Sequence, residues 1–179
     1  MTKVSKVLVC GMSSVGKTSL IKRYIDGEFI GDTRSTIGVD FFMKNVDLED
    51  DDGETIILQI WDLAGEEKFR ELLPDYITGS SGITLAFDQT SPNTLESLNA
   101  WLDVLKNYLS SEVPYVLVAC KNDLEPVVDK EMIDNFLSKH EGINISFIST
   151  SALNGENVDD AFYLLAKKIS AAEEKFGYI

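Results

Sequence analysis

Residues 11–18 constrain the fold of this chain more than any other stretch. They read Gly-Met-Ser-Ser-Val-Gly-Lys-Thr and match the pattern G-x-x-x-x-G-K-[ST], in which a glycine-rich loop surrounds phosphate groups with its backbone N–H groups. Residues 4–10 form an apolar run typical of a buried strand, and residues 18–25 have the spacing of an amphipathic helix. The sequence therefore predicts a strand, a phosphate-binding loop and a helix in this order.

The chemistry of this loop follows from its residue types. Gly11 and Gly16 let the backbone curl so that successive N–H groups point inward, and the helix N-terminus adds a positive dipole end. Lys17 supplies a charge for the outer phosphates, and the hydroxyl of Thr18 can ligate Mg²⁺. A chance glycine-rich turn is the alternative. We expect phosphate contacts from this segment: Ser13, Ser14, Val15, Gly16, Lys17, Thr18 and Ser19.

The rest of the chain alternates strand and helix patterns. Helical patterns cover residues 67–76, 91–109, the neighbourhood of 133–137, and 158–169. Further strand patterns are expected at 39–48, 55–61, 82–88, 115–120 and 143–148. We therefore predict an α/β fold over residues 1–179, with one domain and a doubly wound six-stranded sheet, mostly parallel, with one antiparallel strand. Ligands of such sheets bind beyond the carboxyl ends of the strands.

Composition excludes several classes of function. The formal net charge of −14 argues against nucleic-acid binding and against an anionic membrane surface. Two cysteines, Cys10 and Cys120, end strand-like runs without metal-ligand spacing, which favours buried thiols in a reducing cytoplasm. No apolar run reaches the eighteen residues of a membrane span. His140, the single histidine, is expected to be a cation at a helix end.

Three further motifs narrow the class of nucleotide-binding protein. Residues 62–65 match D-x-x-G, residues 121–123 match K-x-D, and a Ser-Ala pair at 151–152 follows the last predicted strand. In order and spacing the whole chain resembles the small Ras-type GTPases, and residues 36–41 with Trp61 look most like the Rab branch. The resemblance implies a P-loop NTPase of Ras-like fold. It would act as a GTP/GDP switch with Mg²⁺ that hydrolyses GTP, in intracellular trafficking or signalling.

The resemblance assigns roles around the phosphates. Thr18, Thr36 and Asp62 would hold Mg²⁺, the last through a water. Thr36 and the Gly65 N–H would contact the γ-phosphate only in the triphosphate state. The implied catalytic set is Lys17, Thr36, Gly65 and Glu66.

The resemblance also assigns a guanine site. Asp123 would accept both guanine N–H donors, and Lys121 would lay its stem along the base. Phe29 would stack on the edge of the base. The Ala152 N–H would bond the guanine carbonyl, and its neighbours Ser151 and Leu153 would complete the site. Without the other motifs, residues 121–123 could equally be an ordinary exposed loop.

Two positions depart from the family pattern. Glu66 stands where the family usually has a Gln that orients the attacking water, and an ionised carboxylate accepts hydrogen bonds but cannot donate them. We therefore predict slow intrinsic hydrolysis; Glu66 could instead point to solvent without a role, or act as a base. Cys120 replaces the Asn that braces the base and the phosphate loop, which predicts weaker nucleotide affinity with guanine selectivity retained.

Partners follow from the same resemblance. An effector, an exchange factor and a GTPase-activating protein are implied. Phe41, Trp61 and Tyr76 would form an exposed effector patch, unless they are simply core aromatics. We expect a cytoplasmic monomer without a direct membrane anchor, recruited to membranes through a partner. A GTP-locked interaction module with negligible hydrolysis is the first alternative, and a small-molecule phosphotransferase is the second.

Overall fold

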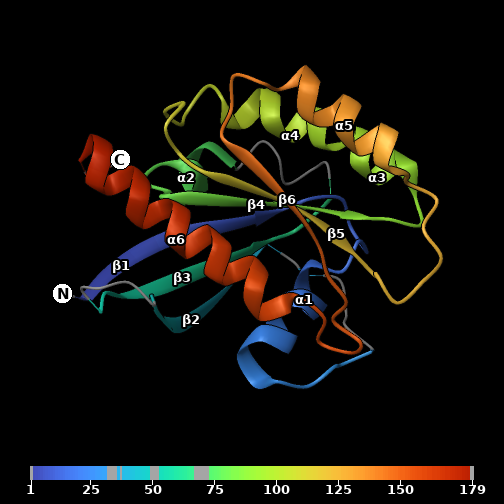
Figure 1. The fold of residues 1–179 in the computed structure, drawn as a ribbon, viewed down its shortest axis with the longest axis horizontal. Coiled ribbons are helices and arrows are strands. Elements are labelled where there is room, and N and C mark those ends of the chain that lie inside the picture. The colour runs from blue at the N-terminus through green and yellow to red at the C-terminus, as the bar shows by residue number, and fades with distance from the viewer. Residues whose placement is uncertain (1, 32–35, 37, 49–52, 67–72, 178–179) are drawn as a thin grey trace.

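The computed structural model describes residues 2–31, 36, 38–48, 53–66 and 73–177 (Figure 1). Most of the helical pattern predicted at 67–76 lies outside these residues. The elements follow one another as β1 (Thr2–Cys10), α1 (Lys17–Asp26), β2 (Val39–Asp47), β3 (Thr55–Leu63), α2 (Leu73–Ile77), β4 (Gly82–Asp88), α3 (Pro92–Glu96), α4 (Leu98–Leu105), β5 (Tyr115–Cys120), α5 (Lys130–Lys139), β6 (Ile145–Ser149) and α6 (Val158–Phe176).

The six strands form a single sheet in the order β2-β3-β1-β4-β5-β6. β2 pairs with β3 antiparallel, and the other neighbours pair parallel. The predicted α/β fold with one antiparallel strand is confirmed. β4 and β5 are buried along their whole length because helices cover both faces of the sheet, which explains their largely apolar sequences.

Helices on the two faces enclose two apolar clusters, and β1 contributes to both. Val7 and Val9 face the cluster under α1 and α6, whereas Leu8 and Cys10 face the cluster under α2 to α5. This alternation is the two-residue period of a strand. Figure 1 shows α6 crossing one face of the sheet, with α4 and α5 together on the other. The strand ends between these layers carry the predicted site residues.

The helical pattern at 91–109 is interrupted at Ser97 and forms α3 and α4. The leucines that recur along this pattern lie on its buried face: Leu95, Leu98, Leu102 and Leu105. Pro92 opens α3, and the side chain of Ser91 before it makes no cap hydrogen bond. The Thr94 hydroxyl instead donates to the Ser91 carbonyl at 2.7 Å.

His140 ends α5 as predicted, but its expected positive charge is wrong. The ring is buried, and Nε2 lies 2.9 Å from Asn99 Oδ1 while Nδ1 lies 3.4 Å from Lys106 Nζ. Burial lowers the pKa of His140, the charges of Lys106 and Lys139 lower it further, and Asp103 opposes them. The ring therefore favours its neutral form at pH 7.

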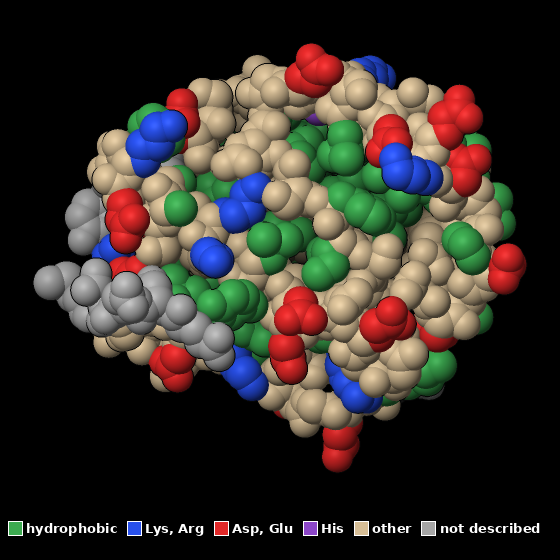
Figure 2. Space-filling model, in the orientation of Figure 1, with side chains coloured by type: hydrophobic (Ala, Val, Ile, Leu, Met, Phe, Trp, Pro, Cys, Tyr) green, Lys and Arg blue, Asp and Glu red, His purple; other side chains and the backbone are tan. Residues whose placement is uncertain are grey.

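The surface agrees with the acidic composition. Figure 2 shows Asp and Glu side chains spread over one face, with Lys and Arg side chains among them. Within the described part of the chain, no helix is long and apolar enough to traverse a bilayer.

Candidate functional site

The predicted site residues meet at one edge of the sheet, as expected for loops that follow parallel strands. The glycine-rich loop follows β1, Ala64 and Gly65 follow β3, Lys121 to Asp123 follow β5, and Ser151 to Leu153 follow β6. These segments are distant in sequence but end at the same side of the molecule because β1, β3, β4, β5 and β6 run parallel.

The glycine-rich loop lies tightly against β4. Gly11 has φ +151°, and a Cβ at this position would lie 2.2 Å from the Ala86 carbonyl oxygen. Gly16 has φ +112° and leads into α1, while Ser14 adopts φ +65° although it is not a glycine. A side chain in this left-handed region costs roughly 1–2 kcal/mol. The loop therefore holds a strained conformation, as loops that bind ligands often do.

Lys17 is held by its own loop. Its ammonium donates to the carbonyls of Gly11 and Met12, each at 2.8 Å, and the side chain is buried. Burial lowers the pKa of Lys17, whereas the nearby carboxyl of Asp62 raises it. A buried cation at the head of a helix is in position to meet an anion.

Three oxygen-bearing side chains converge beside this lysine. Thr18 Oγ1 donates to Asp62 Oδ2 at 2.5 Å and lies 2.7 Å from Thr36 Oγ1. Asp62 is fully buried, and its other oxygen, Oδ1, has no hydrogen-bond partner among the residues that the structure describes. Burial raises the pKa of Asp62, although the Thr18 hydroxyl and Lys17 oppose it. Two hydroxyls and a carboxylate with an unpaired oxygen fit a hard divalent cation such as Mg²⁺.

Gly65 lies directly against the glycine-rich loop. A Cβ at position 65 would lie 2.3 Å from the Ser13 amide nitrogen and 2.6 Å from the Gly11 carbonyl oxygen, so no side chain fits. The preceding Ala64 N–H donates to the Gly38 carbonyl at 3.0 Å, which ties this segment to the start of β2. Glu66 follows and is half-buried.

The predicted guanine-binding residues line one cavity of about 340 Å³. Phe29, Lys121, Asp123, Ala152 and Leu153 all contribute to its wall, together with Ser14, Gly16 and Ser19. Asp123 accepts a hydrogen bond from the Ser151 hydroxyl at 2.5 Å. Ser151 is fully buried, so its side chain positions the Asp123 carboxylate from behind.

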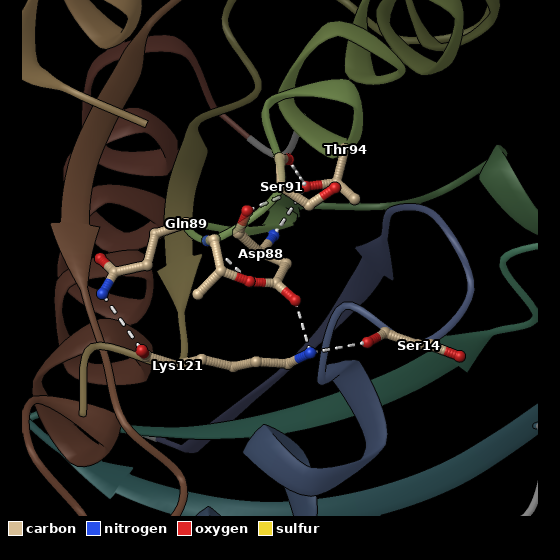
Figure 3. Close-up of polar contacts among 7 residues, drawn as sticks. Ser14, Asp88, Gln89, Ser91, Thr94 and Lys121 are labelled. Atoms are coloured by element: carbon tan, nitrogen blue, oxygen red, sulfur yellow. Dashed lines mark hydrogen bonds and ion pairs between the residues drawn. The ribbon is translucent and has the colours of Figure 1, made fainter. Parts of the chain in front are cut away.

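Two residues that the sequence did not indicate support the K-x-D segment from β4. Lys121 Nζ lies 2.5 Å from Asp88 Oδ2 and donates to the Ser14 carbonyl at 3.2 Å, which joins the end of β4, the K-x-D segment and the glycine-rich loop (Figure 3). Burial raises the pKa of Asp88, but hydrogen bonds from Lys121 and Thr90 outweigh it and leave this pKa below its usual value. Gln89 bonds the same segment through its side chain. Only their place in the sequence could have indicated them, because both residues come at the carboxyl end of a predicted strand, where ligands of such sheets bind.

Cys120 also contributes to the cavity wall, beneath the glycine-rich loop. A Cβ on Gly16 would lie 3.8 Å from Cys120 Sγ, at ordinary van der Waals distance, so the thiol lies beside the loop. Burial raises the pKa of Cys120 to about 12, and that of Cys10 likewise. Both thiols stay protonated at neutral pH and pack as small apolar groups.

The three aromatic residues predicted as an effector patch form a continuous row. The rings of Phe41 and Trp61 are 4.4 Å apart between centroids, and those of Trp61 and Tyr76 are 5.9 Å apart. Phe41 is 57% exposed, whereas Trp61 and Tyr76 are half-buried against the cluster under α2. The Lys6 ammonium lies 4.1 Å from the Trp61 ring centroid. The row is therefore a partly exposed surface across β2, β3 and α2.

Fold and site together define a P-loop nucleotide-binding protein of the α/β class. Comparison with known proteins narrows this class: residues 6–171 match the Ras family model, and the chain belongs to the Ras family of small GTPases.

The relatives are of the Rab type. The chain is 40% identical to "GTP-binding protein YPT1" of Saccharomyces cerevisiae over 166 residues, which cover 92% of this chain and 78% of the relative. It is 40% identical to "Ras-related protein Rab-1D" of Dictyostelium discoideum, with the same coverage. It is 39% identical to "Ras-related protein RABD2b" of Arabidopsis thaliana, covering 92% and 79% of the two chains. Within its family the chain is most similar to the Rab branch.

Proposed function

We propose that residues 1–179 form one guanine-nucleotide-binding domain that switches between GTP and GDP states and acts through protein effectors in intracellular trafficking or signalling. One observation carries this proposal. The cavity wall formed by Phe29, Lys121 and Asp123 adjoins the glycine-rich loop, so a base bound there directs its phosphates towards Lys17 and Thr18.

The base end of the cavity suits guanine. Asp123 presents a carboxylate that can accept the ring N–H and the amino group of guanine, and the Ser151 hydroxyl fixes its orientation. Adenine offers no such pair of donors at the same edge, and the carboxylate would stay unpaired. Phe29, 42% exposed at the mouth, supplies an apolar face for the base. We infer that the Ala152 N–H bonds the guanine carbonyl, with Leu153 beside it.

The phosphate end suits a magnesium triphosphate. Thr18, Thr36 and Asp62 would hold Mg²⁺, whose charge offsets that of the β- and γ-phosphate oxygens when it is bound. The Lys17 ammonium can exchange one of its two loop carbonyls for a phosphate oxygen. Backbone N–H groups of Ser13 to Lys17 and the Gly65 N–H would donate to the phosphates, and Ser19 would complete the α1 end of the site.

Hydrolysis at this site is proposed to be slow without a partner. Glu66 follows Gly65 and brings a carboxylate, rather than a donating amide, to the phosphate end. We expect single-turnover phosphate release to be faster in Glu66→Gln than in the wild type. A wild-type rate equal to or above that of Glu66→Gln would refute this. A rate that stays negligible with candidate activating proteins would favour the GTP-locked module.

Nucleotide identity tests the whole proposal. We expect the purified protein to carry GDP or GTP, released on denaturation and identified by chromatography, and calorimetry to show weaker GDP binding after magnesium is chelated. Asp123→Ala should abolish the preference for GDP over ADP, while Asp129→Ala, which removes only the α5 N-cap, should preserve it. A protein that carries no nucleotide and binds neither GDP nor GTP would refute the proposal.

Cys120 is proposed to weaken nucleotide binding. Its buried thiol lies beside the loop but is a poor hydrogen-bond donor, whereas an Asn amide could donate to the loop. Each added hydrogen bond would contribute about 1 kcal/mol, so we expect Cys120→Asn to tighten GDP binding several-fold. Calorimetry that shows no gain would contradict this interpretation.

The aromatic row is proposed as the effector surface. Phe41 lies on β2, five residues after Thr36 in the sequence, so a change at Thr36 when the triphosphate binds could reach this surface through the start of β2. An exchange factor and an activating protein would act on the same nucleotide states. We propose a monomer, recruited to membranes through a partner; sedimentation of the GDP-bound protein tests the oligomeric state.

A further inference from the structure

Gln89 is a buried residue directly after β4, and only 5% of it is exposed. Its side-chain amide Nε2 donates to the Lys121 carbonyl at 3.1 Å and to the Leu124 carbonyl at 3.0 Å. Figure 3 shows this side chain reaching the Lys121 backbone while the Lys121 ammonium extends the other way, towards Asp88. Gln89 thus bonds the backbone of the K-x-D turn, whereas Asp88 bonds the side chain of Lys121 in that turn.

The backbone of Gln89 forms hydrogen bonds on both sides of the K-x-D turn, to residue 120 before it and to residues 127 and 128 after it. Its N–H donates to the Cys120 carbonyl at 3.3 Å, and its carbonyl accepts from the N–H groups of Val127 and Val128, each at 2.9 Å. The side chain and the main chain together make five hydrogen bonds to residues 120–128. The side chain lies behind the turn and not in the cavity wall, so Gln89 would not touch a bound base.

The turn that Gln89 holds is strained and carries the base-reading carboxylate. Lys121 has φ +66°, and the Leu124 N–H closes the turn on the Lys121 carbonyl at 2.9 Å. A side chain in this backbone region persists where surrounding contacts enforce it. Asp123 lies inside the turn, and its orientation depends on the turn being kept.

The residue at the start of this turn cannot supply that support. Cys120 stands where an Asn would brace the base and the loop, and its thiol is a weak hydrogen-bonding group. We propose that Gln89 is a positioning residue for guanine recognition, which holds the Lys121 to Leu124 turn so that Asp123 faces the base and so replaces the brace lost at Cys120. This inference rests on the proposed function.

Gln89→Leu removes both side-chain hydrogen bonds while it retains the volume. We expect the dissociation rate of a fluorescent GDP analogue to rise about tenfold, since two neutral hydrogen bonds are lost. Xanthosine diphosphate has a carbonyl where guanine has its amino group, so it gains less from an oriented Asp123. Its affinity should stay the same, and the preference for GDP should fall. Equal losses for the two nucleotides, or no change in GDP release, would overturn the inference.

A matched control separates positioning from general damage. Gln59 lies on β3, is half-buried, and accepts a hydrogen bond from Trp61 Nε1 at 3.2 Å, remote from the turn. Gln59→Leu makes the same chemical change and should leave GDP release as in the wild type. The loss caused by Gln89→Leu should shrink when Cys120→Asn is also present, since the amide restores a brace. If Gln89→Leu speeds GDP release equally with Cys120 and with Asn at position 120, Gln89 does not replace the missing Asn.

A second measurement serves if Gln89→Leu fails to fold. Gln89→Met keeps a long flexible chain, and amide hydrogen exchange of peptides covering residues 119–128 reports the turn directly. Faster exchange in this segment, with the rest of the GDP-bound protein unchanged, supports the inference; unchanged exchange overturns it. GDP binding by the wild type in the same experiments tests the proposed function separately. If the wild type binds no GDP, both the proposed function and the role of Gln89 are refuted. If the wild type binds GDP normally and the Gln89 variants behave like it, only the role of Gln89 is refuted.

Discussion

Gly65→Ala is predicted to separate triphosphate binding from diphosphate binding. The new Cβ would lie 2.3 Å from Ser13 N and 2.4 Å from Met12 C, whereas ordinary contacts begin at 3.4 Å. Residue 65 must therefore retreat by about 1 Å, because both neighbours are backbone atoms that cannot turn aside. That displacement would break a hydrogen bond from its N–H to a γ-phosphate. A hydrogen bond to a charged group is worth about 1.5–3 kcal/mol, which corresponds to a roughly 10- to 150-fold loss of affinity.

The assay compares equilibrium binding of GDP with that of a non-hydrolysable GTP analogue. We expect Gly65→Ala to bind the analogue more weakly by this factor and to bind GDP nearly as the wild type does, since the guanine cavity is at the other end of the loop. Gly142→Ala is the matched control because a Cβ at Gly142 meets nothing within 4 Å. The reasoning would be refuted by an unchanged ratio of the two affinities, or by equal losses for both nucleotides.

Three further predictions concern stability. Ser14→Gly relieves φ +65° and should raise the free energy of unfolding in urea by about 0.5–1 kcal/mol; a decrease would show that the Ser14 side chain makes a larger contribution. Gly11→Ala drives a Cβ to 2.2 Å from the Ala86 carbonyl and should cost about 3 kcal/mol in the same assay, and a loss below 1 kcal/mol would contradict the close approach. The lowered pKa of His140 means that the unfolded chain takes up the proton first, so stability should fall as the pH drops below about 6.5, and less steeply in His140→Gln. Parallel pH profiles for the two proteins would rule out this role of His140.

The sequence was most informative where backbone chemistry limits the residue types. The glycine-rich loop needs positive φ at Gly11 and Gly16, and the D-x-x-G segment needs Gly65 because the loops touch there. Strand and helix periods placed the elements, and the order of alternating units indicated the parallel sheet. These features are local, so they can be read without the fold.

The sequence was least informative where function depends on contacts between distant segments. Gln89 and Asp88 follow a strand like ordinary polar residues, and only the pairing of β4 with β5 brings them to Lys121. The charge state of His140 depends on its burial against α4, whereas the preference for cations at helix ends takes no account of burial. The split of the helical pattern at Ser97 likewise leaves no mark on its leucine spacing.

The aromatic row gives the protein an internal optical reporter. The chain has two tryptophans, and Trp101 is fully enclosed in the core, so its emission should stay constant as ligands change. Trp61 is half-exposed between Phe41 and Tyr76 with an ammonium over its ring, a setting in which small shifts of neighbouring groups alter emission colour and intensity. Unlabelled protein could therefore be followed in a fluorimeter through a full cycle of nucleotide loading and turnover, with Trp101→Phe removing the background.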